Sequence, residues 1–180
     1  MVDNSAFETF VYEHQDRVFG IAVRLLGNET EAEDVSQTVF LRAFEHFDRL
    51  GGNPAAGGWL RTVTTNLCLN HLSRYRARWR LFSQRSTAGA AAGRSYEERM
   101  VAPGSQAEDL ERAGEQARLE QGIRGLPPHQ RVPLVLFHFE DRSYKEIAGI
   151  LDVTLAKVKT DIHRGRQALR RLMETDDEAR

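Results

Sequence analysis

Residues 154–172, TLAKVKTDIHRGRQALRRL, carry several side chains that can bind nucleic acid. Lys and Arg donate hydrogen bonds to phosphates and to the acceptor atoms of guanine, and Thr can bond to either. The apolar residues recur at the spacing of one buried helical stripe, which leaves the polar residues outward. The predicted inward residues are Leu155, Val158, Ile162 and Leu169, and the outward ones are Lys157, Lys159, Thr160, His163, Arg164 and Gln167.

A second short helix must precede this one in order to hold it. Ser143 and Glu146 have the S-x-x-E spacing of a capping box, which marks a helix N-terminus. Asp152 and Val153 fill a turn, and Thr154 can cap the next helix. This layout is typical of a helix-turn-helix, whose second helix lies in the major groove of DNA. An ordinary helical hairpin with a solvated basic face is the alternative interpretation. The predicted buried stripe of the first helix is Ile147, Ile150 and Leu151.

The distribution of charge favours nucleic-acid binding on selected faces. The chain has 180 residues and a formal net charge of −1. Acidic residues predominate before residue 61, whereas residues 61–85 contain several arginines and no acidic residue. Basic patches on an otherwise acidic chain suggest a confined nucleic-acid footprint, with acidic surface left for other partners.

Several classes of protein are disfavoured by the composition. No apolar run is long enough to cross a bilayer and no signal peptide is evident, so we expect a cytoplasmic protein without membrane insertion. The single cysteine, Cys68, forms only a C-x-x-H with His71, and we interpret it as a small buried residue. The histidines are scattered without a nucleophile motif, so neither catalysis, a metal nor a cofactor is expected.

The apolar periodicity is helical throughout, which predicts an all-α fold. A first helix ends at Gly27, a second begins with a Thr30–Glu33 capping box, and a third begins near Trp59 after the loop at 51–58. The Ala- and Gly-rich residues 83–105 are predicted to be a flexible linker. Pro127 and Pro128 end one later helix and open the next. The predicted organisation is a domain at 1–82, the linker at 83–105, a second domain at 106–173 and a polar tail at 174–180.

Four motifs in this order carry a resemblance to a known family. They are AEDVSQTVFLRAF at 32–44, WLRTVTTNLCLNHLSRYR at 59–76, LPPHQRVPLVLFHFEDRSYKEIAGIL at 126–151 and VKTDIHRGRQALRRL at 158–172. The chain resembles the bacterial ECF (extracytoplasmic function) RNA polymerase sigma factors, group IV of the sigma family. The resemblance implies a region-two helical bundle and a region-four helix-turn-helix. It further implies an alternative sigma factor that binds core RNA polymerase, recognises the −35 and −10 promoter elements, promotes promoter melting and is masked by an anti-sigma factor.

The resemblance assigns the contact with core polymerase to the second helix. The implied residues are Asp34, Gln37, Phe40 and Leu41. Thr38 departs from the acidic residue common in the family. The competing interpretation is that Val35, Phe40 and Phe44 pack the core of the domain.

The third helix and the loop before it correspond to the family's binding site for the single-stranded −10 element. An unstacked base requires amide groups for its Watson–Crick edge and cations along its phosphates. The residues implied are Asn66, Asn70, Arg74, Arg76 and Arg78, with residues 51–58 as the specificity loop. For Trp59 we favour core packing over DNA contact.

The −35 element is expected to be bound as duplex DNA by the helix after Thr154. The implied residues are Lys159, Thr160, His163 and Arg164. Asp161 stands where relatives commonly carry Arg. Its carboxylate either removes a phosphate clamp, or accepts from cytosine, or turns toward Arg164 or Arg131. A stand-alone helix-turn-helix regulator that binds duplex DNA without polymerase is the alternative function.

Overall fold

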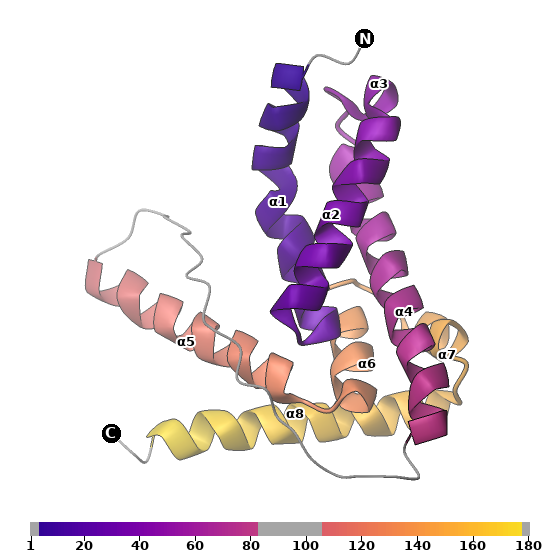
Figure 1. Ribbon diagram of the computed structural model, residues 1–180. Helices are drawn as coiled ribbons and strands as arrows, with labels where there is room; N and C mark the ends of the chain where they lie inside the picture. The colour runs from indigo at the N-terminus through magenta and orange to yellow at the C-terminus, as the bar shows by residue number, and fades with distance from the viewer. Residues whose placement is uncertain (1–3, 83–105, 178–180) are drawn as a thin grey trace. The chain divides into compact units, whose positions relative to one another are not determined.

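The structure, a computed structural model, is helical wherever it is described (Figure 1). It describes the backbone of residues 4–82 and 106–177, and the side chains of residues 4–73 and 113–174. Within these ranges there are eight helices and no strand, so the predicted all-α fold is confirmed. The helices are α1 (Asn4–Leu26), α2 (Glu29–Glu45), α3 (Phe47–Leu50), α4 (Ala56–Phe82), α5 (Gln106–Gly125), α6 (Pro128–His138), α7 (Tyr144–Leu151) and α8 (Leu155–Asp177).

The chain divides into two helical units, Met1–Gly93 and Arg94–Arg180. Helices α1–α4 belong to the first unit and α5–α8 to the second. The predicted linker at 83–105 lies outside the described residues. Helix α8 continues to Asp177, past the domain end predicted at residue 173.

The core of the first unit lies where α1 packs against α2 and α4. Val18, Leu25, Val39 and Leu60 are fully or almost fully buried there. Cys68 is also fully buried, as predicted. An edge-to-face aromatic cluster closes one end of this core. In it the ring of Phe7 contacts those of Phe44, at 4.9 Å between centroids, and Phe47, at 5.2 Å.

The start of α2 differs from the prediction. Gly27 turns the chain with φ of +68°, and the N-cap is then Asn28. The side chain of Asn28 accepts a hydrogen bond from the Glu31 N–H at 3.0 Å. The predicted Thr30–Glu33 capping box was therefore wrong, because Asn28 already satisfies this helix end and Thr30 lies inside the helix.

The third predicted helix begins earlier than expected. α4 starts at Ala56, so the loop before it is shorter than the predicted 51–58, and Gly57 and Gly58 are helical. Phe47 opens the short helix α3, which follows α2 after His46. Trp59 is half-buried, and its ring lies edge-on to that of His46, with 5.9 Å between the ring centroids. This contact agrees with a packing role.

The predicted caps of the helix-turn-helix are confirmed. The Ser143 hydroxyl accepts from the Glu146 N–H at 3.3 Å, and the Glu146 carboxylate accepts from the Ser143 N–H at 2.8 Å. The Ser143 hydroxyl also donates to the Glu146 carboxylate at 2.7 Å, and this bond, followed by the one from the Ser143 N–H, lowers the pKa of Glu146. Asp152 adopts a left-handed conformation after α7. The Thr154 hydroxyl then accepts from the Lys157 N–H at 3.2 Å, at the start of α8.

Two residues predicted to be inward are exposed. Ile147, Val158 and Ile162 are buried as expected, but Ile150 and Leu155 are 43% and 39% exposed. The short helix α7 buries the stripe through Ile147, and Ile150 lies at the solvent edge of that stripe. Leu155 is the first residue of α8, beside the turn, before the helix is covered by its neighbours.

A polar and aromatic cluster ties α8 to α6 and α7. The Arg166 Nε donates to the His138 Nε2 at 3.0 Å, and the Arg166 guanidinium lies 5.5 Å from the centroid of the Phe137 ring. Phe137 stacks on Tyr144 at 4.6 Å. Desolvation, and then the charge of Arg166, lower the pKa of His138. The cluster thus requires a neutral His138.

We expect Gly27→Ala to destabilise the first unit by about 1 kcal/mol, because an L-residue is disfavoured at a positive φ. Gly58→Ala is the matched control in the same unit. Its added Cβ meets nothing within 4 Å, and removing a helical glycine should stabilise by about 0.5–1 kcal/mol. Urea unfolding followed by circular dichroism measures both. Equal effects of the two substitutions would contradict this account of Gly27.

The His138 cluster predicts a pH dependence of stability. Because the pKa of His138 is lower in the folded than in the unfolded state, the unfolded state binds the proton more readily, and stability falls as the pH drops through about 6.5. Thermal unfolding between pH 7.5 and 5.5 should therefore show a smaller loss for His138→Gln than for the wild type. The control, His163→Gln on the exposed face of α8, should keep the wild-type dependence. An unchanged profile for His138→Gln would refute this role.

Candidate nucleic-acid and protein interfaces

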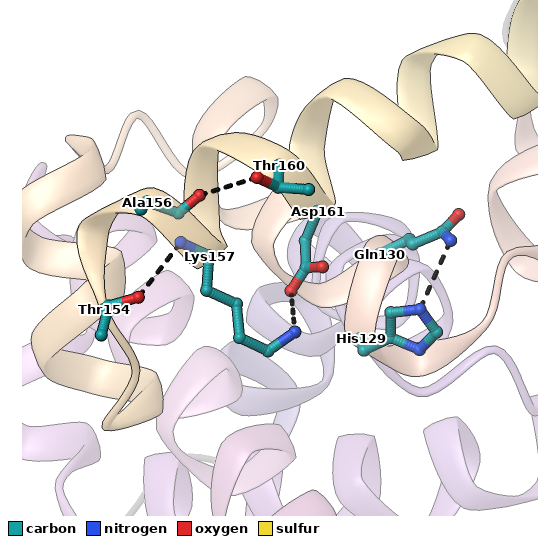
Figure 2. A network of polar contacts seen from close by, with 7 residues as sticks. All are labelled: His129, Gln130, Thr154, Ala156, Lys157, Thr160 and Asp161. Carbon is teal, nitrogen blue, oxygen red and sulfur yellow. Dashed lines mark hydrogen bonds and ion pairs between the residues drawn. The ribbon is translucent and has the colours of Figure 1, made fainter.

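Helix α8 exposes the residues predicted to bind the −35 element. Val158 and Ile162 hold its inner face in the core, at 1% and 0% exposure. The Thr160 hydroxyl donates to the Ala156 carbonyl at 2.9 Å (Figure 2), so its oxygen is left to accept from a base. The residues Lys159, Thr160, His163 and Arg164 are all exposed.

Asp161 lies away from this exposed face. Its side chain is 7% exposed, and its Oδ2 accepts a hydrogen bond from the Lys157 Nζ at 2.7 Å. The carboxylate is buried and pairs with Lys157, so the suggestion that it turns toward Arg164 or Arg131 was wrong, and acceptance from cytosine stays a prediction. The Arg131 guanidinium instead donates to the carbonyls of Arg124 and Leu126, at 3.1 and 2.9 Å. The loss of a phosphate contact at position 161, relative to an arginine there, stays a prediction.

Helix α4 carries a stripe of exposed, uncharged polar residues. Asn66 and Asn70 are exposed one turn apart. Thr62 and Ser73, which sequence reasoning did not single out, are exposed on the same stripe. Helical spacing could have identified both, because Thr62 precedes Asn66 by four residues and Ser73 follows Asn70 by three. The opposite face, with Leu60, Thr64 and Cys68, is buried.

The arginines predicted to follow the −10 strand are described only in part. The backbone of α4 continues as a helix through Arg74, Arg76 and Arg78 to Phe82. The side chains of these three arginines lie outside the described residues. Their contact with DNA therefore remains a prediction.

Helix α2 exposes most of its predicted polymerase-binding residues on one face. Asp34, Gln37 and Leu41 are exposed at i, i+3 and i+7, with Leu41 at 68%. Phe40 is half-buried at the edge of this face. Of the residues for which core packing was the alternative, Val35 is buried.

Phe44 is a residue of this face that sequence reasoning missed. It is 41% exposed, and it lies one turn from Leu41. Its ring also contacts Phe7 of α1. Helical spacing alone did not distinguish this partly exposed phenylalanine from a core residue.

Other kinds of site were sought in the part of the chain that the structure describes. There, no group of three or more His, Cys, Asp or Glu side chains could hold a metal ion. No described helix is long and apolar enough to cross a membrane.

Two family models match the two units. The Sigma-70 region 2 model matches residues 10–78, which include α2 and most of α4. The Sigma-70 region 4 model matches residues 116–169, which include α6, α7 and the exposed face of α8. The candidate residues of all three helices thus lie inside matched ranges.

Similar proteins agree with these matches. The chain is 34% identical over 170 residues to the ECF RNA polymerase sigma factor SigW of Bacillus subtilis, covering 94% of this chain and 89% of that protein. It is 36% identical over 168 residues to the ECF RNA polymerase sigma factor SigE of Mycolicibacterium smegmatis, covering 92% of this chain and 60% of that protein.

A solved structure shares the fold. It is that of the sigma factor RpoE in complex with the anti-sigma factor NepR from Bartonella quintana, with a TM-score of 0.54 and 20% identity, over 94% of this chain and 98% of that one. This likeness shows the fold, and the family models together with the relatives carry the assignment that the four sequence motifs suggested. The chain belongs to the ECF family of RNA polymerase sigma factors.

Proposed function

We propose that this alternative sigma factor divides transcription initiation among three exposed helical faces. One face of α2 binds core RNA polymerase, the polar stripe of α4 binds the single-stranded −10 element, and the outer face of α8 binds the duplex −35 element. The observation that carries the proposal is the chemical difference between the faces. The α2 face is acidic and apolar, the α4 stripe is uncharged, and the α8 face is basic.

The α4 stripe suits capture of unstacked bases. An exposed amide such as that of Asn66 can both donate to and accept from the Watson–Crick edge of a base. Because the protein would bind these bases only when they are unpaired, binding would shift the equilibrium toward the melted duplex. Melting of this kind requires no ATP. The arginines at 74, 76 and 78 would follow the phosphates of the captured strand.

The outer face of α8 suits duplex DNA. Lys159 and Arg164 donate to phosphates or guanine acceptors, while the Thr160 oxygen accepts from a base amine. Each unit alone would make only a few phosphate contacts, and such binding is weak and sensitive to salt. Binding of both units on one polymerase raises the effective concentration of each at its promoter element.

The α2 face suits a protein partner. Exposed Leu41 and Phe44 supply apolar area, and Asp34 adds a negative charge that DNA would repel. We assign Asp34, Gln37, Phe40 and Leu41 to core polymerase. An anti-sigma factor is the further partner we propose, since the structural neighbour was solved with one. The protein would act in the cytoplasm and without enzymatic activity.

The decisive experiment is run-off transcription with core polymerase on a pool of promoter fragments. Core polymerase alone should produce no run-off RNA. With the protein added, transcription should initiate at defined sites. A stand-alone regulator would instead bind duplex DNA tightly by itself and start no RNA. The family models describe sigma-70 regions, and the relatives named above are sigma factors. Both support initiation that depends on the added protein.

Asn66→Ala should impair promoter opening and spare closed-complex formation. Loss of one base contact of this kind costs about 1–3 kcal/mol, so we expect about 5- to 150-fold fewer open complexes. Arg164→Ala on α8 is the reciprocal variant and should reduce closed complexes first. Permanganate footprinting measures opening, and gel shifts measure closed complexes. Loss of closed complexes in Asn66→Ala would contradict the division of labour.

Leu41→Ala should weaken binding to core polymerase. Removing an exposed apolar side chain at the centre of an interface costs about 1–2 kcal/mol, which corresponds to about a tenfold rise in Kd. Tyr12→Ala on α1 is the control, because Tyr12 is as accessible, at 77% exposed against 68% for Leu41, and lies on a different helix. Fluorescence titration with core polymerase measures both. Equal losses would argue against the α2 face as the binding site.

A further inference from the structure

Asp161 is a buried carboxylate on the helix that we propose binds the −35 element. It lies one turn before Gly165, where α6 approaches α8 closely. A Cβ built on Gly165 would lie 2.9 Å from the Leu134 Cδ1 and 3.5 Å from the Gln130 carbonyl oxygen. Asp161 itself is buried, with 5% of the whole residue exposed. A buried carboxylate requires a partner, because its desolvation is otherwise costly.

Lys157 is that partner. Figure 2 shows its side chain folding along α8, so that the ammonium lies beside the Asp161 carboxylate, on the side where His129 and Gln130 begin α6. The Nζ to Oδ2 distance is 2.7 Å. Although the Lys157 side chain is half exposed, its ammonium is thereby held at the buried Asp161 carboxylate, whereas Thr160 and His163 are exposed.

Helix stability does not explain this ion pair. Lys157 lies in the first turn of α8, where a cation opposes the helix dipole. An acidic residue that follows lysine by four positions is also the weaker of the two orders on a helix. Burial of the Asp161 carboxylate is what requires the pair, and one consequence is that a cation is withdrawn from those available for DNA.

Asp161 lies between two cations on the same flank of α8. Lys157 precedes it by one turn, and Arg164 follows it by three residues, which places both within reach of its carboxylate. The carboxylate pairs with Lys157 and leaves Arg164 exposed. Lys157, whose charge is compact and flexible, is thus neutralised. Arg164, whose guanidinium can make bidentate hydrogen bonds, stays available for DNA.

We propose that Asp161 is a positioning residue that withholds Lys157 from the DNA backbone and so limits sequence-independent duplex binding. This inference rests on the proposed contact of α8 with DNA. Phosphate contacts supply nearly all non-specific affinity, so one fewer contact favours sites that Lys159, Thr160, His163 and Arg164 recognise. Weaker non-specific binding also leaves the protein dependent on polymerase for promoter binding.

The test is the salt dependence of binding of the full chain to a labelled duplex without promoter sequence, measured by fluorescence anisotropy. In Asp161→Asn the freed Lys157 should gain one phosphate contact, which steepens the slope of log affinity against log salt by about 0.9. Between 50 and 200 mM salt this variant should lose about 3.5-fold more affinity than the wild type. Lys157→Met alone should keep the wild-type slope.

A double variant separates the release of Lys157 from a general change of charge. Asp161→Asn combined with Lys157→Met should have the slope of Lys157→Met alone. A steeper slope in the double variant would overturn the inference, because the effect would then not require Lys157. It would also be overturned by a shallower slope in Lys157→Met alone, or by no change in Asp161→Asn.

A further control distinguishes this inference from the proposed function. Lys159→Met removes a proposed phosphate contact of α8. The slope of log affinity against log salt should therefore become shallower by about 0.9. If it does so while Asp161→Asn has no effect, only the role of Asp161 fails. If Lys159→Met also has no effect, the contact of α8 with DNA fails, and the inference fails with it.

Discussion

Helices α2, α4 and α8 each bury one apolar stripe, and the rest of the structure depends on that burial. Short helices are marginal in water by themselves, so their stability comes from packing. Val18, Leu25 and Leu60 supply it in the first unit, and Val135 and Ile162 supply it in the second. Each such side chain contributes about 1.5–3 kcal/mol when it is fully buried. Because a helix buries one stripe, its opposite face is left in water, where it can bind a partner without disturbing the core.

The exposed faces differ because the buried stripes do not constrain their composition. One face of α2 combines acidic and apolar residues, the stripe of α4 is uncharged, and the outer face of α8 is basic. This segregation explains how a chain with a net charge of −1 can belong to a DNA-binding family. At ordinary salt, charges further apart than about 10 Å are largely screened from one another. Basic residues on one face can therefore attract DNA despite acidic residues elsewhere on the protein.

Polar contacts inside the protein determine which charged side chains remain available to bind a partner. The Arg131 guanidinium bonds the carbonyls of Arg124 and Leu126, and so satisfies backbone groups left open at the end of α5. Asp161 engages Lys157 in the same unit. In both cases a cation that looks free in the sequence is bound within the protein. The basic character of α8 is therefore smaller, and more sharply placed, than its composition indicates.

The sequence by itself determined the fold class, because apolar periodicity and capping motifs are local properties of a helix, and its four motifs indicated the family. It also indicated which of the candidate residues on α2, α4 and α8 are exposed. The Ser143–Glu146 box and the turn at Asp152 were correctly predicted for this reason. Tertiary structure decided what local patterns leave open. It selected Asn28 over Thr30 as a cap, exposed Ile150, Leu155 and Phe44, and buried Asp161. The physical reason is that burial depends on which neighbouring helix covers a residue, and the close approach of α6 at Gly165 is a contact between distant segments that no local spacing reveals.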